Sequence, residues 1–179
     1  INIVAIAVIL FGSLTGREMP LTVVQMLWIN IIMDTLGGLA FAGEPALERY
    51  MKEKPKKRDE AILNGYMVNQ ILFLGGFSVL LFLFFLKCPL ITSLFRHTEG
   101  NLCHLTAFFG LFIFASVLNC FNARTARLSL AAGLGKNKTF LGIMGAILAI
   151  QLIFLYLGGS VLRTMPLTAR ELWITWLLA

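Results

Sequence analysis

Residues 21–43 read LTVVQMLWINIIMDTLGGLAFAG, an apolar run with one acidic residue, Asp34, near its middle. A membrane-spanning helix needs about 20 apolar residues, so this run is long enough to cross a bilayer. A charged carboxylate at the centre of such a helix costs about 2.5–3.5 kcal/mol even on the gentler insertion scales, and intramembrane acids usually serve a function. Asp34 is therefore the first candidate functional residue.

The whole chain has the composition of an integral membrane protein. It is 58% hydrophobic and 13% charged, with a mean hydropathy of +0.83. The first and last of its six apolar runs are too short to span, so we predict an all-α polytopic membrane helical bundle of four complete spans flanked by two partial ones. The other five runs cover residues 1–12, 64–86, 104–123, 139–162 and 171–179.

Because the two outermost runs are incomplete, we expect residues 1–179 to be one membrane domain of a longer chain. The residues from Ile1 onward also lack the basic region and the small-residue cleavage site of a signal peptide.

The basic residues are distributed unevenly among the connections between runs. Six lie in connection 44–63 and four in connection 124–138, whereas the other connections carry one or two each. By the positive-inside rule we predict that these two connections are cytoplasmic. The net charge of +6 thus follows from topology, and we expect no nucleic-acid partner. The stretch Lys52–Arg58 has two interpretations: a solvated loop near anionic lipid, or a docking surface for a soluble domain.

Cys88 and Cys103 bracket the same outward-facing connection. A disulfide between them and two free thiols are both consistent with the sequence. His97 and His104 lie near the same connection, but the spacing of these four residues matches no zinc-binding pattern.

Asn30 and Asp34 are four positions apart, which places both side chains on one face of a helix. An amide oxygen and a carboxylate are the hard donors that calcium prefers, and because calcium takes about six to eight oxygens the pair forms only part of a site. Gly37-Gly38 follows closely. The glycines predict either an interruption of the helix beside an ion or a small-residue packing patch.

Further polar residues lie in the other spans. Ser116, Asn119 and Asn122 form a stripe at intervals of three, and interhelical hydrogen bonding is their simplest interpretation, as it is for Gln151. The role of Asn2 is open. No glycine-rich phosphate loop, acid pair or nucleophile with a histidine partner occurs in the sequence, so we expect no catalytic residue in this stretch.

The stretch from Val24 to Leu36, followed by AFAGEP at residues 40–45, closely resembles the sixth membrane helix of P-type calcium-transporting ATPases of the plasma-membrane-type branch. The order of the other features agrees, from Asn2 in a preceding half helix to a basic loop and a later FNAR at residues 121–124. The resemblance implies that the six runs correspond to the fifth to tenth helices of such a pump.

The resemblance also implies roles for single residues. Asn30 and Asp34 match the ligands that the sixth helix gives to one calcium site. Asn2 matches an asparagine that serves a second site in two-calcium pumps, and Ser116 and Asn119 are candidate accessory positions. Ala5, Met33 and Ser116 stand where two-calcium pumps have a glutamate, a threonine and a glutamate. So few oxygen donors imply a single calcium per cycle.

In the family, ATP and Mg²⁺ are bound by domains that would precede Ile1, and the loop 44–63 approaches the phosphorylation domain. The resemblance therefore implies an ATP-driven calcium exporter of the plasma membrane, whose partners are Ca²⁺, the lipid bilayer and that phosphorylation domain. The alternatives are a P-type pump for another cation, or a non-enzymatic helical membrane module in which a buried cation neutralises Asp34. No Lys or Arg lies within a span to serve as that cation.

Overall fold

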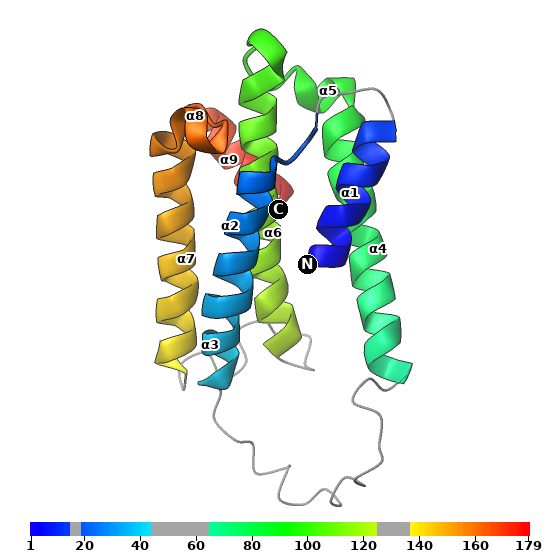
Figure 1. The fold of residues 1–179 in the computed structure, drawn as a ribbon, viewed down its shortest axis with the longest axis vertical. Helices are drawn as coiled ribbons and strands as arrows, with labels where there is room; N and C mark the ends of the chain where they lie inside the picture. The colour runs from blue at the N-terminus through cyan, green and yellow to red at the C-terminus, as the bar shows by residue number, and fades with distance from the viewer. Residues whose placement is uncertain (15–18, 44–64, 125–136) are drawn as a thin grey trace, which may run out of the picture.

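A computed structural model describes residues 1–14, 19–43, 65–124 and 137–179 (Figure 1). Within these residues it contains helices and no strands, which confirms the predicted all-α bundle. Four helical segments are long and apolar enough to cross a membrane, and α1 (Asn2–Leu14) is a shorter apolar helix. The four segments are Val23–Ala42, Met67–Lys87, Glu99–Ala123 and Lys138–Leu157.

The first of these segments is built from three consecutive pieces: α2 (Val23–Asn30), the π-helix η1 (Ile31–Gly37) and α3 (Gly38–Ala42). The elements that follow are α4 (Gly65–Lys87), α5 (Pro89–Thr92), the 3₁₀ turn η3 (Glu99–Asn101), α6 (Leu102–Arg124), α7 (Lys138–Leu157), α8 (Gly159–Leu162) and α9 (Ala169–Leu178).

The run predicted to span residues 139–162 bends before its end. α7 stops at Leu157, and Gly159 has a positive φ of 48° that favours glycine. A Cβ atom on Gly158 would collide with the carbonyl oxygen of Phe154 and would lie 2.7 Å from Thr164 Oγ1. The two glycines thus allow the chain to turn into α8 at the end of the span.

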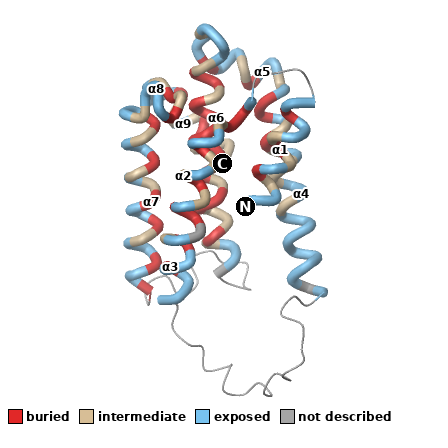
Figure 2. Tube along the Cα trace, in the orientation of Figure 1, coloured by how far each residue is buried: buried red, intermediate tan, exposed pale blue. Residues whose placement is uncertain are grey.

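The helix α6 forms the centre of the bundle. In the most apolar stretch of its span 72% of the residues are buried, whereas in the corresponding stretch of α4 only 11% are buried. The helix α4 lies at the edge of the bundle beside α1 (Figure 2). Phe108, Phe109 and Phe112 of α6 are almost completely buried, and Phe82 of α4 packs on two of these rings. Aromatic and aliphatic packing against α6 therefore holds the bundle together.

The ends of the spans agree with the predicted topology. α3 and α6 end, and α4 and α7 begin, at the same end of the bundle, whereas α5 and α8 lie at the opposite end (Figure 1). The connections 44–63 and 125–136 that join these helices lie outside the described residues. Which end faces the cytoplasm stays a prediction.

At the opposite end, Glu171 in the first turn of α9 is buried and accepts several hydrogen bonds. Its carboxylate accepts from the Arg96 backbone N–H at 3.1 Å and from Arg96 Nε at 3.0 Å. The Thr168 N–H donates at 2.7 Å, and Cys103 Sγ lies at 3.3 Å. Glu171 thereby joins α9 to the loop before α6.

Among the described residues, the cysteines and histidines near this loop form neither a disulfide nor a metal-binding cluster. Cys88 and Cys103 are free thiols in the structure. His104 Nε2 lies 3.1 Å from the carbonyl oxygen of Phe85, and its ring stacks on the Phe85 ring at 4.9 Å. Among the described residues, no three His, Cys, Asp or Glu side chains are grouped so as to hold a metal.

Burial acts to raise the pKa of Glu171, but hydrogen bonds from Arg96 and Thr168 outweigh it and lower the pKa from 4.5 to about 2. Glu171 lies outside the four candidate spans. A carboxyl whose pKa is lower in the folded state stabilises the fold above its unfolded pKa and loses that contribution as the pH falls through the folded value. The contribution of Glu171 is therefore complete at neutral pH.

We expect Glu171→Gln to lower the free energy of unfolding by about 2 kcal/mol at neutral pH, because a charge-assisted acceptor of several donors is lost. Thermal unfolding of the full-length protein in detergent measures the effect. The difference from wild type should shrink as the pH is lowered from about 5 to about 3, because the carboxyl of Glu171 then binds a proton in the unfolded state while it stays ionised in the folded state. Glu99→Gln, at an exposed acid on the same side, is the matched control; an equal effect of both variants at all pH values would contradict the assignment.

Candidate functional site

The segment that carries Asp34 is a continuous helix whose hydrogen-bond pattern changes in its middle. Over Ile31–Gly37 it is a π-helix, with α-helix before and after. Short π-helical stretches are rare and occur frequently at functional sites. Asp34 is the fourth residue of this stretch, so the backbone irregularity and the intramembrane acid coincide.

The two glycines do not unwind the helix. Gly37 and Gly38 have right-handed helical φ values of −63° and −57°. A Cβ atom on either would meet no other atom within 4 Å, so neither glycine is needed for close packing. The sequence thus pointed to the right region of the helix, but the departure from α-helix is a widened turn that ends at the glycines.

The wider turn changes the hydrogen-bond pattern of the backbone around Asp34. A π-turn bonds residue i to i+5, so it takes up one residue more than an α-turn, and the i+4 position falls just short of a full turn. The backbones of Asn30 and Asp34 therefore still lie about one turn apart. Where the pattern tightens again, the N–H of Gly38 donates to the carbonyl of Thr35. At this change of pattern, close to Asp34, the backbone departs from the regular i-to-i+4 bonding of an α-helix.

Asn30 is half-buried, at the last position of α2. The side chain of Asp34 lies outside the described part of the structure. The convergence of the Asn30 and Asp34 oxygens on one point therefore stays a prediction.

Gln25 fixes the N-terminal end of this helix. Thr22 and Gln25 form a reciprocal capping box, in which Thr22 N–H donates to Gln25 Oε1 at 2.8 Å and Gln25 N–H donates to Thr22 Oγ1 at 3.2 Å. The amide Nε2 of the same side chain donates to the carbonyl oxygen of Leu162 at 2.8 Å. Gln25 thus starts α2 and ties it to α8.

Ring contacts hold the same helix against α7 on both sides of η1. The Trp28 and Phe154 ring centroids are 4.2 Å apart, and those of Phe41 and Phe140 are 5.9 Å apart. The π-helical stretch lies between these two contacts and itself packs against α7. The candidate site is therefore anchored above and below the widened turn.

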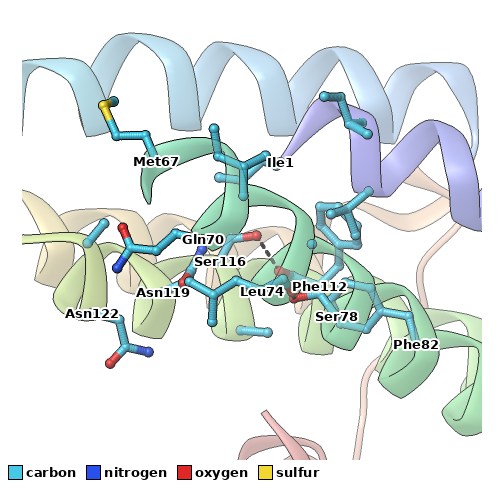
Figure 3. Close-up of a pocket in the computed structure, with 16 residues that line it drawn as sticks. Ile1, Met67, Gln70, Leu74, Ser78, Phe82, Phe112, Ser116, Asn119 and Asn122 are labelled. Carbon is cyan, nitrogen blue, oxygen red and sulfur yellow. Dashed lines mark hydrogen bonds between the residues drawn. The ribbon is translucent and has the colours of Figure 1, made fainter. Parts of the chain in front are cut away.

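A cavity of about 430 Å³ lies between α1, α4 and α6 (Figure 3). Figure 3 shows Gln70 of α4 around it together with the polar stripe Ser116, Asn119 and Asn122 of α6. Ser116 Oγ donates to the Phe112 carbonyl at 2.7 Å, so the bond expected to another helix is made within α6 instead. Among the described residues that line the cavity, α1 contributes Ile3 and Val4 but not Asn2, which is exposed.

The structure thus gathers two of the three candidate accessory residues, Ser116 and Asn119, around one cavity. Asn30 is not among the described residues that line it. Whether any of the three accessory residues acts on an ion stays a prediction.

Sequence reasoning gave Gln151 of α7 too little weight. Its side chain is completely buried, yet Oε1 and Nε2 have no hydrogen-bond partner among the described residues. The indole N–H of Trp28 is likewise buried without a partner. The signal available in the sequence was an amide in the middle of an apolar span, which alone does not distinguish a paired group from an unpaired one.

Comparison with known proteins places the chain among ion-pump sequences. Residues 18–179 match the family described as "Cation transporting ATPase, C-terminus". The chain is 32% identical to the probable plasma membrane-type calcium-transporting ATPase 6 of Oryza sativa, over 97% of this chain and 17% of that protein. It is 31% identical to the plasma membrane calcium-transporting ATPase mca-1 of Caenorhabditis elegans, over 97% of this chain and 14% of that protein.

A third relative is the plasma membrane-type calcium-transporting ATPase 12 of Arabidopsis thaliana, which is 35% identical over 86% of this chain and 14% of its own length. The chain therefore spans about one seventh to one sixth of the length of these curated relatives.

We expect Gln25→Met to lower the free energy of unfolding by about 2 kcal/mol, because it removes half of the capping box and leaves the buried Leu162 carbonyl without its donor. Thermal unfolding of the full-length protein without added ions is the measurement. Ser160→Ala, at an exposed serine of α8, is the control and should change stability by less than about 0.5 kcal/mol. A Gln25→Met protein as stable as wild type would show that Gln25 does not anchor α2.

Proposed function

The chain belongs to the family of carboxyl-terminal regions of cation-transporting ATPases, and from this premise we propose that it is the membrane part of an ATP-driven pump that exports calcium from the cytosol. The relatives described above are named as plasma membrane calcium-transporting ATPases. The plasma membrane is accordingly the proposed location. The four apolar helices support a place within a bilayer.

The observation that carries the proposal is the π-helical stretch around Asp34. Calcium takes about six to eight oxygen ligands, from carboxylates, amide side chains, backbone carbonyls and water. The widened turn would let a backbone carbonyl of η1 join the carboxylate of Asp34 and the amide oxygen of Asn30 around the ion. Transporters use irregular backbone in this way at the depth where an ion binds. Asn30 and Asp34 are thus the proposed metal ligands of this chain.

We propose one calcium per cycle. Ala5 and Met33, at positions where two-calcium pumps have oxygen donors by the resemblance, are buried apolar residues. Ser116 keeps its hydroxyl, but that group already donates to Phe112. Asn2, Ser116 and Asn119 then serve as accessory groups, with hydrogen bonding or water as their contribution.

In the proposed cycle, calcium reaches Asn30 and Asp34 from the cytoplasmic side. ATP and Mg²⁺ act in domains of the full-length protein outside this chain, where an aspartate accepts the phosphoryl group. The loop 44–63, which begins directly after α3, would transmit that event to η1. A carboxylate left empty in hydrocarbon is costly, so Asp34 would take up a proton when calcium leaves.

Asp34→Asn in the full-length protein should reduce ATP-driven calcium uptake into vesicles by at least about 100-fold, because even outer partners of metal ligands contribute about 10–100-fold to affinity. Glu99→Gln is the control, since this acid is exposed at the far end of the bundle. Uptake retained by Asp34→Asn would overturn the ligand assignment. Wild-type ATP hydrolysis that depends on sodium or potassium instead of calcium would point to a pump for another cation.

The single-site proposal predicts that close to one calcium is transported for each ATP hydrolysed. Simultaneous measurement of calcium uptake and phosphate release in sealed vesicles gives this ratio. A ratio near two would contradict the single site while leaving Asp34 as a ligand.

A further inference from the structure

Two polar groups inside the bundle have no hydrogen-bond partner among the described residues. One is the amide of Gln151, whose side chain is 0% exposed. The other is the indole N–H of Trp28, which is buried although the ring itself is partly exposed. A buried polar group without a partner costs about 1–3 kcal/mol, so each one requires an explanation.

The two groups lie on facing helices and close to the same level. Trp28 contacts Phe154, and Gln151 precedes Phe154 by three positions, so it lies on the same face of α7 one turn closer to its start. α2 and α7 run in opposite directions, since Trp28 meets Phe154 and Phe41 meets Phe140. The position opposite Gln151 is therefore two or three residues after Trp28, at the level of Asn30.

The chemistry of the two groups is complementary. The indole N–H can only donate, and the amide oxygen of Gln151 can accept. A single bond between them would satisfy Trp28 completely and Gln151 in part. Asn30 and the start of η1 lie two and three residues after Trp28, so a hydrogen bond that holds the indole would also set the orientation of the proposed ion-binding stretch.

The π-helix η1 is where such a bond could be made and broken. A change of its seven residues to α-helical pitch would turn α2 relative to α3 and carry the indole around the helix axis. Helix shifts of about 1–2 Å are among the known forms of switching between two states of a protein. The bond can thus be made in one arrangement and broken in another.

We propose that Gln151 is a positioning residue of the transport site, which accepts a hydrogen bond from the Trp28 indole in one state of the transport cycle and releases it in the state described here. The proposal rests on the proposed function, because the two states are those of the pump. The pair acts through the orientation of α2 and η1, and it does not itself touch calcium.

The test is a double-mutant cycle in the full-length protein reconstituted in vesicles, with Trp28→Phe, Gln151→Met and both together. Trp28→Phe keeps an aromatic ring without the N–H, and Gln151→Met keeps the length of the side chain without its polar atoms. Two quantities are measured: the calcium concentration for half-maximal ATP hydrolysis, and the concentration of vanadate, a phosphate analogue that binds the calcium-free pump, for half inhibition.

We expect each single variant to shift the two concentrations by about three- to tenfold, the effect of one hydrogen bond, with calcium and vanadate affinity changing in opposite directions. The double variant should shift them no further than either single variant, because the same bond is lost only once. Trp173→Phe removes an indole from an exposed tryptophan of α9 and should leave both concentrations unchanged.

Three results would overturn the proposal: additive shifts in the double variant, unchanged concentrations in both single variants, or a change in thermal stability alone. The last would indicate that a buried water bridges the two groups in every state. If Gln151→Met does not fold, Gln151→Leu takes its place, and the single variant Trp28→Phe still tests the proposal because it must shift both concentrations. A wild-type protein without calcium-dependent ATP hydrolysis would overturn the proposed function as well, whereas the other results leave it intact.

Discussion

In the interior of a bilayer the backbone has no water to bond with, so every peptide group must find a partner within the protein. Irregular backbone at that depth persists only where other helices cover it or where it lines a polar site. The π-helical stretch Ile31–Gly37 obeys this constraint. It packs against α7, and ring contacts through Trp28 and Phe41 hold the helix to α7 on either side. The packing of α7 against this helix therefore allows a widened turn around Asp34.

The parts of the bundle differ in how firmly they are held. α6 is buried along most of its length, and the Glu171 network joins α9 to the loop before α6. These well-packed elements form the frame of the bundle. The helix α2–η1–α3 is instead fixed at its N-terminal end by Gln25 and along α7 by two ring pairs, with the unpaired amide of Gln151 between them. A frame of this kind allows a local change at η1 without repacking the core.

The spans were largely predictable from the sequence, because length and hydropathy determine which segments cross a membrane. The cost of a buried charge singles out Asp34 as a candidate, and its role as a ligand stays a prediction. The π-turn was not predictable, since it depends on packing against α7, and the glycines indicated only the region. Glu171 pairs with Arg96 across a separation of 75 positions, which no local pattern reveals. Gln151 was identified as polar and intramembrane, but only the structure shows that its amide has no partner.

Charge balance supports the proposal that this chain, with one intramembrane acid, contributes to a site for one calcium ion. A divalent cation held by Asp34 alone would leave a net positive charge in a medium of low dielectric, which is as unfavourable as the unpaired carboxylate. The resemblance supplies a glutamate from an earlier helix, and two carboxylates would neutralise a single dication. A second dication would require two further acids, but by the resemblance Ala5 and Ser116 stand where two-calcium pumps have glutamates, and both are buried. In the proposed cycle the same balance would place protons on the emptied carboxylates after calcium leaves, so the proposed site would exchange protons for calcium.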